Sequence, residues 1–148
     1  MNSQTERQTE EQVADRLRRA ITRTSRRLRR EAGGGLTPTQ LATLGSVDRH
    51  GVVTPGELAE IEGVRRPSVT RVVGNLIEAG MVERRPDPTD GRCSLLSVTP
   101  AGREYLDRHR LRKSAWLARR LEAMNPEDVR TLDRAAAILE SALKEEPA

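Results

Sequence analysis

Residues 54–99 read TPGELAEIEGVRRPSVTRVVGNLIEAGMVERRPDPTDGRCSLLSVT, and this stretch decides the fold. It opens with a helix start, because Thr54 can cap the first turn, Pro55 suits the first helical position, and Glu57 can bond back to the cap. Gly63 then tolerates the backbone conformation that a tight helix stop needs. The side chains of this short helix that we expect to face a core are Leu58, Ala59 and Ile61.

A second helix follows after a short turn, and its two faces differ in chemistry. Apolar residues recur at helical spacing along one side and predict a buried stripe. This stripe consists of Val69, Val72, Val73, Leu76 and Ile77. The remaining face is rich in hydrogen-bond donors. It displays Ser68, Thr70, Arg71, Gly74 and Asn75, with Arg65, Arg66 and Pro67 at the helix entrance.

A donor-rich helix face of this kind suits the major groove of DNA. That groove admits an α-helix and presents acceptor-rich base edges, which arginine reads in a bidentate way and serine or threonine reads more loosely. The unsatisfied N–H groups at the start of such a helix also favour phosphate. The alternative is an ordinary amphipathic helix whose polar face is simply solvated.

Two strand-like runs follow and predict a β-hairpin. Residues 81–85 form the first run and residues 93–98 the second, while Pro86–Gly91 is the loop, with Asp-Gly as its turn signal. On the second strand Leu96 and Val98 should share a face. Arg92 sits beside the loop tip, where an arginine can enter a narrow minor groove.

Further charged residues of the hairpin are candidates for the same surface. Asp87 or Asp90 can hold a neighbouring arginine in position through its carboxylate. The hairpin residues that we expect at a DNA interface are Arg84, Arg85, Asp90 and Arg92. The alternative is a solvated charged hairpin. The helix, turn, helix and hairpin together predict a winged helix-turn-helix.

The run from Glu57 to Gly102 resembles the MarR family of bacterial transcription regulators. The matching features are the ELA helix, RPSVTRVV, LIEAGMVERR, the wing Asp90-x-Arg92 and the closing LSVTPAG. The resemblance implies that the second helix enters the major groove, that the wing arginine reaches the minor groove, and that a dimer binds a palindromic site. The residues to which it assigns those roles are Ser68, Thr70, Arg71 and Arg92. One departure is Arg65, where the family often has a small capping residue.

Helical patterns flank this unit on both sides. Residues 10–31 read as a long helix, the three glycines at 33–35 break it, and a second capping box at Thr37 opens a helix that ends near Gly51. Residues 100–124 and a last segment from Asn125 read as two more helices. We expect residues 10–32 and 100–146 to form a helical dimerisation region and 36–99 the winged helix-turn-helix, within one compact domain. The fold class is therefore mainly α with a small β-wing.

Apolar spacing in the last helix indicates a partner for that region. Val129, Leu132, Ala136, Leu139 and Leu143 alternate steps of three and four, as in a coiled coil. We expect a homodimer, which would place two recognition helices about one DNA turn, roughly 34 Å, apart. The alternative is a bundle within a monomer.

Positive charge is concentrated rather than spread evenly. The chain has 26 basic and 22 acidic residues and a formal net charge of +4. Residues 16–30 hold eight arginines and no acid. This segment is either a second surface for DNA or a partner, or a solvated helix face that favours solubility.

Several classes of protein are disfavoured by the sequence. Apolar runs are too short to span a membrane and the start lacks an apolar signal region, so we expect a cytoplasmic protein. The single Cys93 excludes an internal disulfide, and we interpret it as a small half-buried strand residue rather than a redox switch. His50 and His109 lack partners at metal-ligand spacing. We therefore expect no enzyme, no metal and no other cofactor.

The sequence thus predicts a sequence-specific regulator that binds double-stranded DNA as a homodimer, and most simply a repressor at a promoter palindrome. The resemblance further implies a small-molecule effector between the DNA-binding lobe and the dimer helices, although the sequence marks no ligand residue. Two alternatives stay open. One is a basic architectural DNA-binding protein with little sequence preference, and the other is a regulator whose helical lobe mainly binds protein partners.

Overall fold

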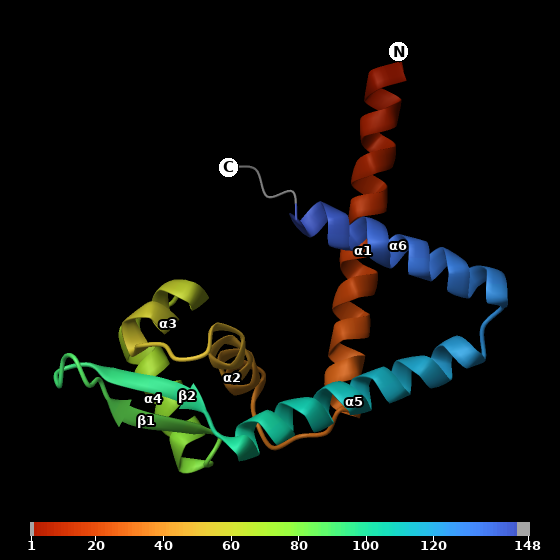
Figure 1. Ribbon diagram of the computed structural model, residues 1–148. Coiled ribbons are helices and arrows are strands. Elements are labelled where there is room, and N and C mark those ends of the chain that lie inside the picture. The colour runs from red at the N-terminus through yellow and green to blue at the C-terminus, as the bar shows by residue number, and fades with distance from the viewer. Residues whose placement is uncertain (1, 145–148) are drawn as a thin grey trace.

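A computed structural model describes residues 2–144 of the chain, with side chains described from residue 9 onward. Residues 145 and 146, which we assigned to the dimerisation region, lie outside this range. Within it, six helices accompany one two-stranded antiparallel sheet, so the fold is mainly helical with a small wing (Figure 1). The elements are α1 (Asn2–Glu31), α2 (Pro38–His50), α3 (Pro55–Glu62), α4 (Arg66–Glu78), β1 (Val82–Pro86), β2 (Ser94–Val98), α5 (Pro100–Glu122) and α6 (Pro126–Lys144).

The helix starts follow the capping chemistry of the sequence. The Thr37 hydroxyl accepts a hydrogen bond from the Gln40 N–H (3.2 Å), and the Gln40 side chain accepts one from the Thr37 N–H (2.8 Å). Thr54 and Glu57 make the same reciprocal pair at the start of α3. Our prediction for α1 was too short, because the helix begins at Asn2 instead of residue 10. Residues 2–9 contain neither glycine nor proline, so extending an existing helix through them costs little.

One apolar core joins α2, α3, α4 and the hairpin. The α4 stripe lies against it as predicted, with Val69, Val73 and Leu76 buried and Val72 and Ile77 partly buried. The other large side chains that are almost fully buried are Leu44, Val47, Leu58, Val82 and Leu96. Our prediction for Ile61 was wrong, since 41% of its surface is exposed. It lies instead at the edge of an open groove between α2 and α3.

The hairpin has the predicted pairing but slightly different limits. Val82 pairs with Val98 and Arg84 with Leu96, so β1 begins one residue later than expected and includes Pro86. Leu96 and Val98 are both buried, which confirms their shared face. Sequence analysis missed a further bridge, in which the Val53 and Leu96 backbones exchange hydrogen bonds of 3.1 and 2.8 Å. This bridge ties the α2–α3 loop to the wing.

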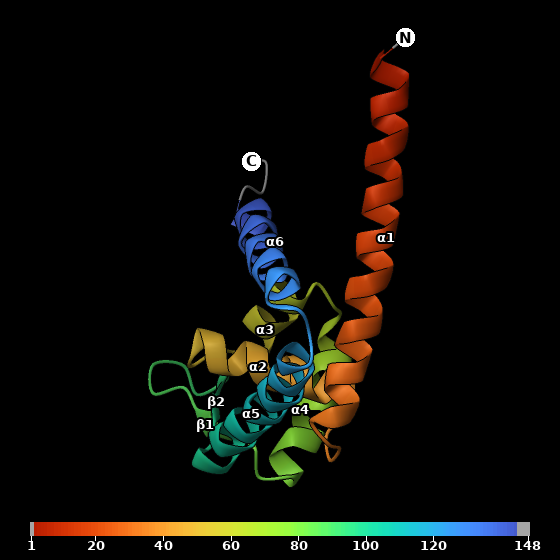
Figure 2. The same ribbon diagram turned by 90° about the vertical axis from the view of Figure 1, so that its right-hand side faces the viewer.

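The remaining helices, α1, α5 and α6, leave the lobe formed by α2, α3, α4 and the hairpin as long, sparsely packed arms. Helix α5 carries the chain from the wing past the lower end of α1 and on to the turn before α6, while the upper half of α1 extends well away from α5 (Figure 1). Helix α6 crosses α1 in that view, but the two are clearly separated after a quarter turn (Figure 2). No described residue of α6 is buried. Of the predicted α6 stripe, Leu132, Ala136, Leu139 and Leu143 are exposed in the single chain and Val129 is half-buried, whereas Leu106 of α5 is buried in the core.

Two α5 side chains hold the loop that connects α1 to α2. The Tyr105 hydroxyl accepts a hydrogen bond from the Leu36 N–H (3.2 Å). The Arg112 guanidinium donates to the Ala32 carbonyl at the end of α1 (3.1 Å). A second link joins α5 to α2, where Asp48 forms ion pairs with Arg103 and Arg110. The α1 and α5 arms are therefore attached to the lobe through specific polar contacts.

Candidate nucleic-acid interface

Helix α4 presents its polar residues in two neighbouring rows. Because residues three or four apart share a helix face, Ser68, Arg71 and Asn75 form one row, and Arg66 and Thr70 form the other. All five side chains are exposed, and the buried stripe lies on the opposite side. Within the described residues, Arg71 forms no ion pair. The first row is thus free to contact another molecule.

The entrance of α4 lacks a side-chain cap. Arg65 occupies the capping position in an extended conformation, and its side chain makes no capping hydrogen bond, while Pro67 lies in the first turn. Arg65, Arg66 and Pro67 are all exposed. The departure that we noted at Arg65 therefore leaves an open, positively charged helix start, and such an end favours an anion.

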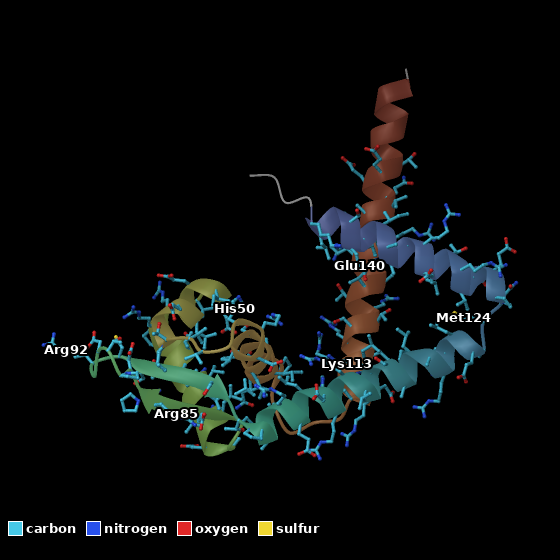
Figure 3. All side chains as sticks on the ribbon, viewed as in Figure 1. His50, Arg85, Arg92, Lys113, Met124 and Glu140 are labelled. Carbon is cyan, nitrogen blue, oxygen red and sulfur yellow. The ribbon has the colours of Figure 1, made fainter. Side chains whose placement is uncertain are left out.

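The wing loop is built by its own hydrogen bonds. Asp87 accepts from the Thr89 N–H (2.8 Å) and hydroxyl (2.7 Å), and these bonds lower the pKa of the Asp87 carboxyl. Asp90 accepts from the backbone N–H of Arg92 at 3.0 Å. Asp90 therefore holds Arg92 in position, as we suggested, but through the Arg92 backbone and not its guanidinium, whereas Asp87 fixes the loop at Thr89 and not at an arginine. Figure 3 shows Arg92 at the outer end of the hairpin.

The two adjacent wing arginines have different surroundings. Neighbouring strand residues point to opposite faces, so Arg84 and Arg85 separate. Arg85 forms an ion pair with Glu83 at 2.9 Å (Figure 3). Arg84 instead lines a cleft between the wing and α4. The structure thus brings Arg84 together with the second row of α4 and leaves Arg85 outside that group.

This arginine cleft has a volume of about 350 Å³. Its polar lining combines three arginines with hydroxyl side chains, and no acidic residue lines it. The lining consists of Thr54, Pro55, Gly56, Arg66, Thr70, Arg84, Arg92, Cys93 and Ser94. Sequence analysis identified the arginines and Thr70 but missed Thr54, Gly56 and Ser94 as members, because only the folded chain places the start of α3 and β2 beside α4.

Cys93 differs from our expectation. It is exposed and precedes β2 rather than lying half-buried within the strand. Its pKa is raised, first by the negative charge of Asp90 and then by burial, and its Sγ lies 3.7 Å from Asp90 Oδ2. A raised pKa reduces the thiolate fraction and hence the reactivity of the thiol.

A second cavity, of about 490 Å³, lies between the lobe and the arms. The end of α1 contributes Arg26, Arg29 and Arg30, and α5 contributes His109. The apolar part of the lining is Leu36, Pro38 and Leu41. Burial lowers the pKa of His109, and the charges of Lys113 and Arg112 lower it further. The cavity therefore combines a neutral imidazole and three guanidinium groups with an apolar wall.

Comparison with known proteins identifies the class. A family model described as MarR family matches residues 34–92. The transcriptional regulator MT0903.1 of Mycobacterium tuberculosis, which is of the helix-turn-helix type, is 41% identical over 135 residues, which cover 90% of this chain and 94% of that protein. A crystal structure of a transcriptional regulator from Pseudomonas aeruginosa is 34% identical with a TM-score of 0.80, covering 93% of this chain and 97% of that one.

A third comparison concerns the fold alone. A mutant of E. coli MarR, solved in complex with operator DNA, has a TM-score of 0.56 at 24% identity and covers 83% of this chain and 92% of that one. The helical arms, the hairpin wing and α4 of our structure thus recur in solved regulators. Together with the similarity to MT0903.1 over nearly the full length, these matches show that the chain belongs to the MarR family of helix-turn-helix transcriptional regulators.

Proposed function

We propose that this protein is a sequence-specific repressor that binds a palindromic promoter site on double-stranded DNA as a homodimer. The observation that carries the proposal is the free row of Ser68, Arg71 and Asn75 on α4, which is exposed, while the neighbouring row of Arg66 and Thr70 shares a cleft with the wing. Short donors and one arginine on a protruding helix suit base edges in the major groove. Arg92 at the wing tip suits the minor groove. We assign the DNA-binding region to residues 36–99, and its site of action to the cytoplasm, where bacterial DNA lies.

Fluorescence anisotropy tests this proposal. Purified protein is titrated onto a labelled duplex from its own upstream region and onto a scrambled duplex of the same composition, across a salt series. A preference of about a thousandfold for the upstream duplex supports base readout. Equal affinity for both duplexes, with a steep loss as salt rises, would favour the architectural alternative instead.

The homodimer is supported by the exposed apolar side chains of the arms. Val13, Leu17 and Ile21 lie at steps of four on α1 and are each more than 40% exposed. Helix α6 adds Leu132, Ile138, Leu139 and Leu143, which are also exposed. Leaving so much apolar area in water is costly, at about 25 cal/mol per Å². A second copy of the same arms would cover it with matching surfaces.

The double variant Leu132→Glu/Leu139→Glu should be monomeric. Two buried charges without partners are strongly unfavourable at an interface, so sedimentation should show the dimer mass for the wild type and the monomer mass for the variant. DNA affinity should fall about a hundredfold or more because both half-sites no longer bind together. The matched control, Arg130→Glu/Ala137→Glu, changes two exposed residues on the side of α6 away from Leu132 and Leu139 and should remain dimeric. A dimeric Leu132→Glu/Leu139→Glu protein would exclude this interface.

We further propose that the cavity between the lobe and the arms binds an organic acid that releases DNA. Its arginines can pair with a carboxylate, and Leu36 and Leu41 offer an apolar wall. The cavity touches the α1–α2 loop, which the α5 contacts of Tyr105 and Arg112 hold in place. A ligand there can therefore change the position of the lobe relative to the arms.

Benzoate provides a simple probe of this site, with benzyl alcohol as the uncharged control. We expect calorimetry to show benzoate binding that tightens as the pH falls below neutral, because His109, whose pKa is lowered in the free protein, takes up a proton beside the carboxylate. The variant His109→Gln should lose this pH dependence. Equal binding of benzoate and benzyl alcohol, or binding that survives Arg26→Gln/Arg30→Gln, would contradict an acid site in this cavity.

A further inference from the structure

Gly56 occupies an unusual position beside the arginine cleft. A Cβ atom placed on it would lie 2.6 Å from Arg66 Nη2 and 3.2 Å from Arg66 Cζ. The guanidinium of Arg66 thus lies directly over the bare Cα of Gly56. Gly56 is in the first turn of α3 and does not have a positive φ, so its backbone does not require glycine. Alanine would favour the helix by up to about 1 kcal/mol, and helix formation therefore gives no reason for glycine here.

The guanidinium that Gly56 admits is one of three around the same cleft. Arg66, Arg84 and Arg92 line it together, and none of them forms an ion pair among the residues that the structure describes. The nearby carboxylate of Glu57 is already used, since it accepts hydrogen bonds from the Thr54 N–H (2.7 Å) and hydroxyl (3.0 Å). Three like charges around one unfilled cleft repel one another. An anion with several acceptor oxygens would relieve this repulsion.

We infer that this cleft, which we call the phosphate seat, is the binding site for one DNA backbone phosphate. Gly56 is a positioning residue, because it leaves room for the Arg66 guanidinium in this site. The inference rests on the proposed function, because the cleft lies between α4, which we place in the major groove, and the wing, which we place in the minor groove. The backbone strand that separates two adjacent grooves passes between such elements. Ser94 adds a hydroxyl group beside the phosphate. The hydroxyl groups of Thr54 and Thr70 also line the cleft, but they already donate to Glu57 Oε2 (3.0 Å) and to the Arg66 carbonyl (3.0 Å).

Losing a phosphate contact changes DNA affinity and its salt dependence in a different way from losing a contact with a base. Phosphate contacts carry no sequence information, so losing one weakens binding to every duplex by a similar factor. Each lost phosphate contact also lowers the slope of log affinity against log salt by about one. A base contact would instead change the preference between duplexes.

The test compares the wild type with Gly56→Ala, Arg66→Ala and the double variant, each titrated by anisotropy onto the upstream and scrambled duplexes across a salt series. Gly56→Ala should weaken binding to both duplexes about tenfold and lower the salt slope by about one per bound chain. The double variant should bind like Arg66→Ala alone, because Gly56 acts only through Arg66. The control Gly45→Ala, whose Cβ would meet only Arg49 at 3.5 Å, should bind like the wild type.

Thermal unfolding separates positioning from folding. Since the far end of a flexible arginine can move away, Gly56→Ala should keep or slightly raise the melting temperature. Wild-type affinity of Gly56→Ala, a changed preference between duplexes, or additive losses in the double variant would each overturn the phosphate seat while the proposed function stands. If the wild type binds neither duplex, the proposed function fails and the phosphate seat fails with it.

Discussion

Gly102→Ala should destabilise the protein by about 3 kcal/mol, which is at the high end for overpacking a filled interior. Gly102 lies in the first turn of α5, where a Cβ would collide with the carbonyl oxygen of Met81 and lie 3.0 Å from its carbonyl carbon and 2.9 Å from Val98 Cγ1. Unlike an arginine tip, this carbonyl is fixed, since it accepts a hydrogen bond from the Thr99 N–H (3.0 Å). Helix α5 would have to move away from the wing.

Urea denaturation measures this loss directly. The midpoint for Gly102→Ala should fall clearly below that of the wild type, with a similar slope. Gly45→Ala serves as the matched control, because it also adds a methyl group to a buried helical glycine but meets only the end of Arg49. Equal midpoints for the two alanine variants would show that α5 does not pack against Met81 as the structure has it.

Arg71→Ala should remove much of the sequence preference. Arg71 is exposed in the free row of α4 and forms no ion pair among the described residues, so its guanidinium is available for a bidentate contact with guanine. Such a contact discriminates by about 1–3 kcal/mol, which corresponds to a loss of roughly ten- to a hundredfold in preference at that base pair.

Competition between duplexes that differ at single base pairs measures this preference. We expect Arg71→Ala to lose discrimination at one position of each half-site while keeping the salt slope of the wild type. Arg66→Ala is the informative comparison, since it should weaken all duplexes alike. If Arg71→Ala also weakens all duplexes alike, Arg71 contacts phosphate and the base-reading role must be assigned to another residue.

Local sequence signals predicted most of the fold. The capping boxes at Thr37 and Thr54 depend on residues three apart, and the α4 stripe repeats within one helix, so short-range chemistry determines both. The wing pairing followed from alternation and a turn signal. The observed helices and strands differ from the predicted ones mainly in their bounds, since α1 begins at Asn2 and Cys93 lies outside β2.

Contacts between distant segments were not predictable in this way. The Val53–Leu96 bridge and the approach of Gly56 to Arg66 join residues that no periodic pattern relates. Only Asp90 holds an arginine, through the backbone N–H of Arg92, while Asp87 accepts from the Thr89 N–H of the same tight loop, which the sequence alone did not indicate. The exposure of Ile61 depends on the groove that α2 and α3 leave between them, which the sequence of α3 alone does not indicate.

Dimethyl sulfate footprinting on the upstream duplex tests the central claim most directly, because the reagent methylates guanine N7 in the major groove and adenine N3 in the minor groove. We expect two patches of guanine protection about 10 base pairs apart, where the two copies of α4 lie, and adenine protection on their flanks, where Arg92 enters the minor groove. Arg92→Ala should lose only the adenine protection. A footprint without guanine protection, or one spread evenly along the duplex, would contradict base reading by α4.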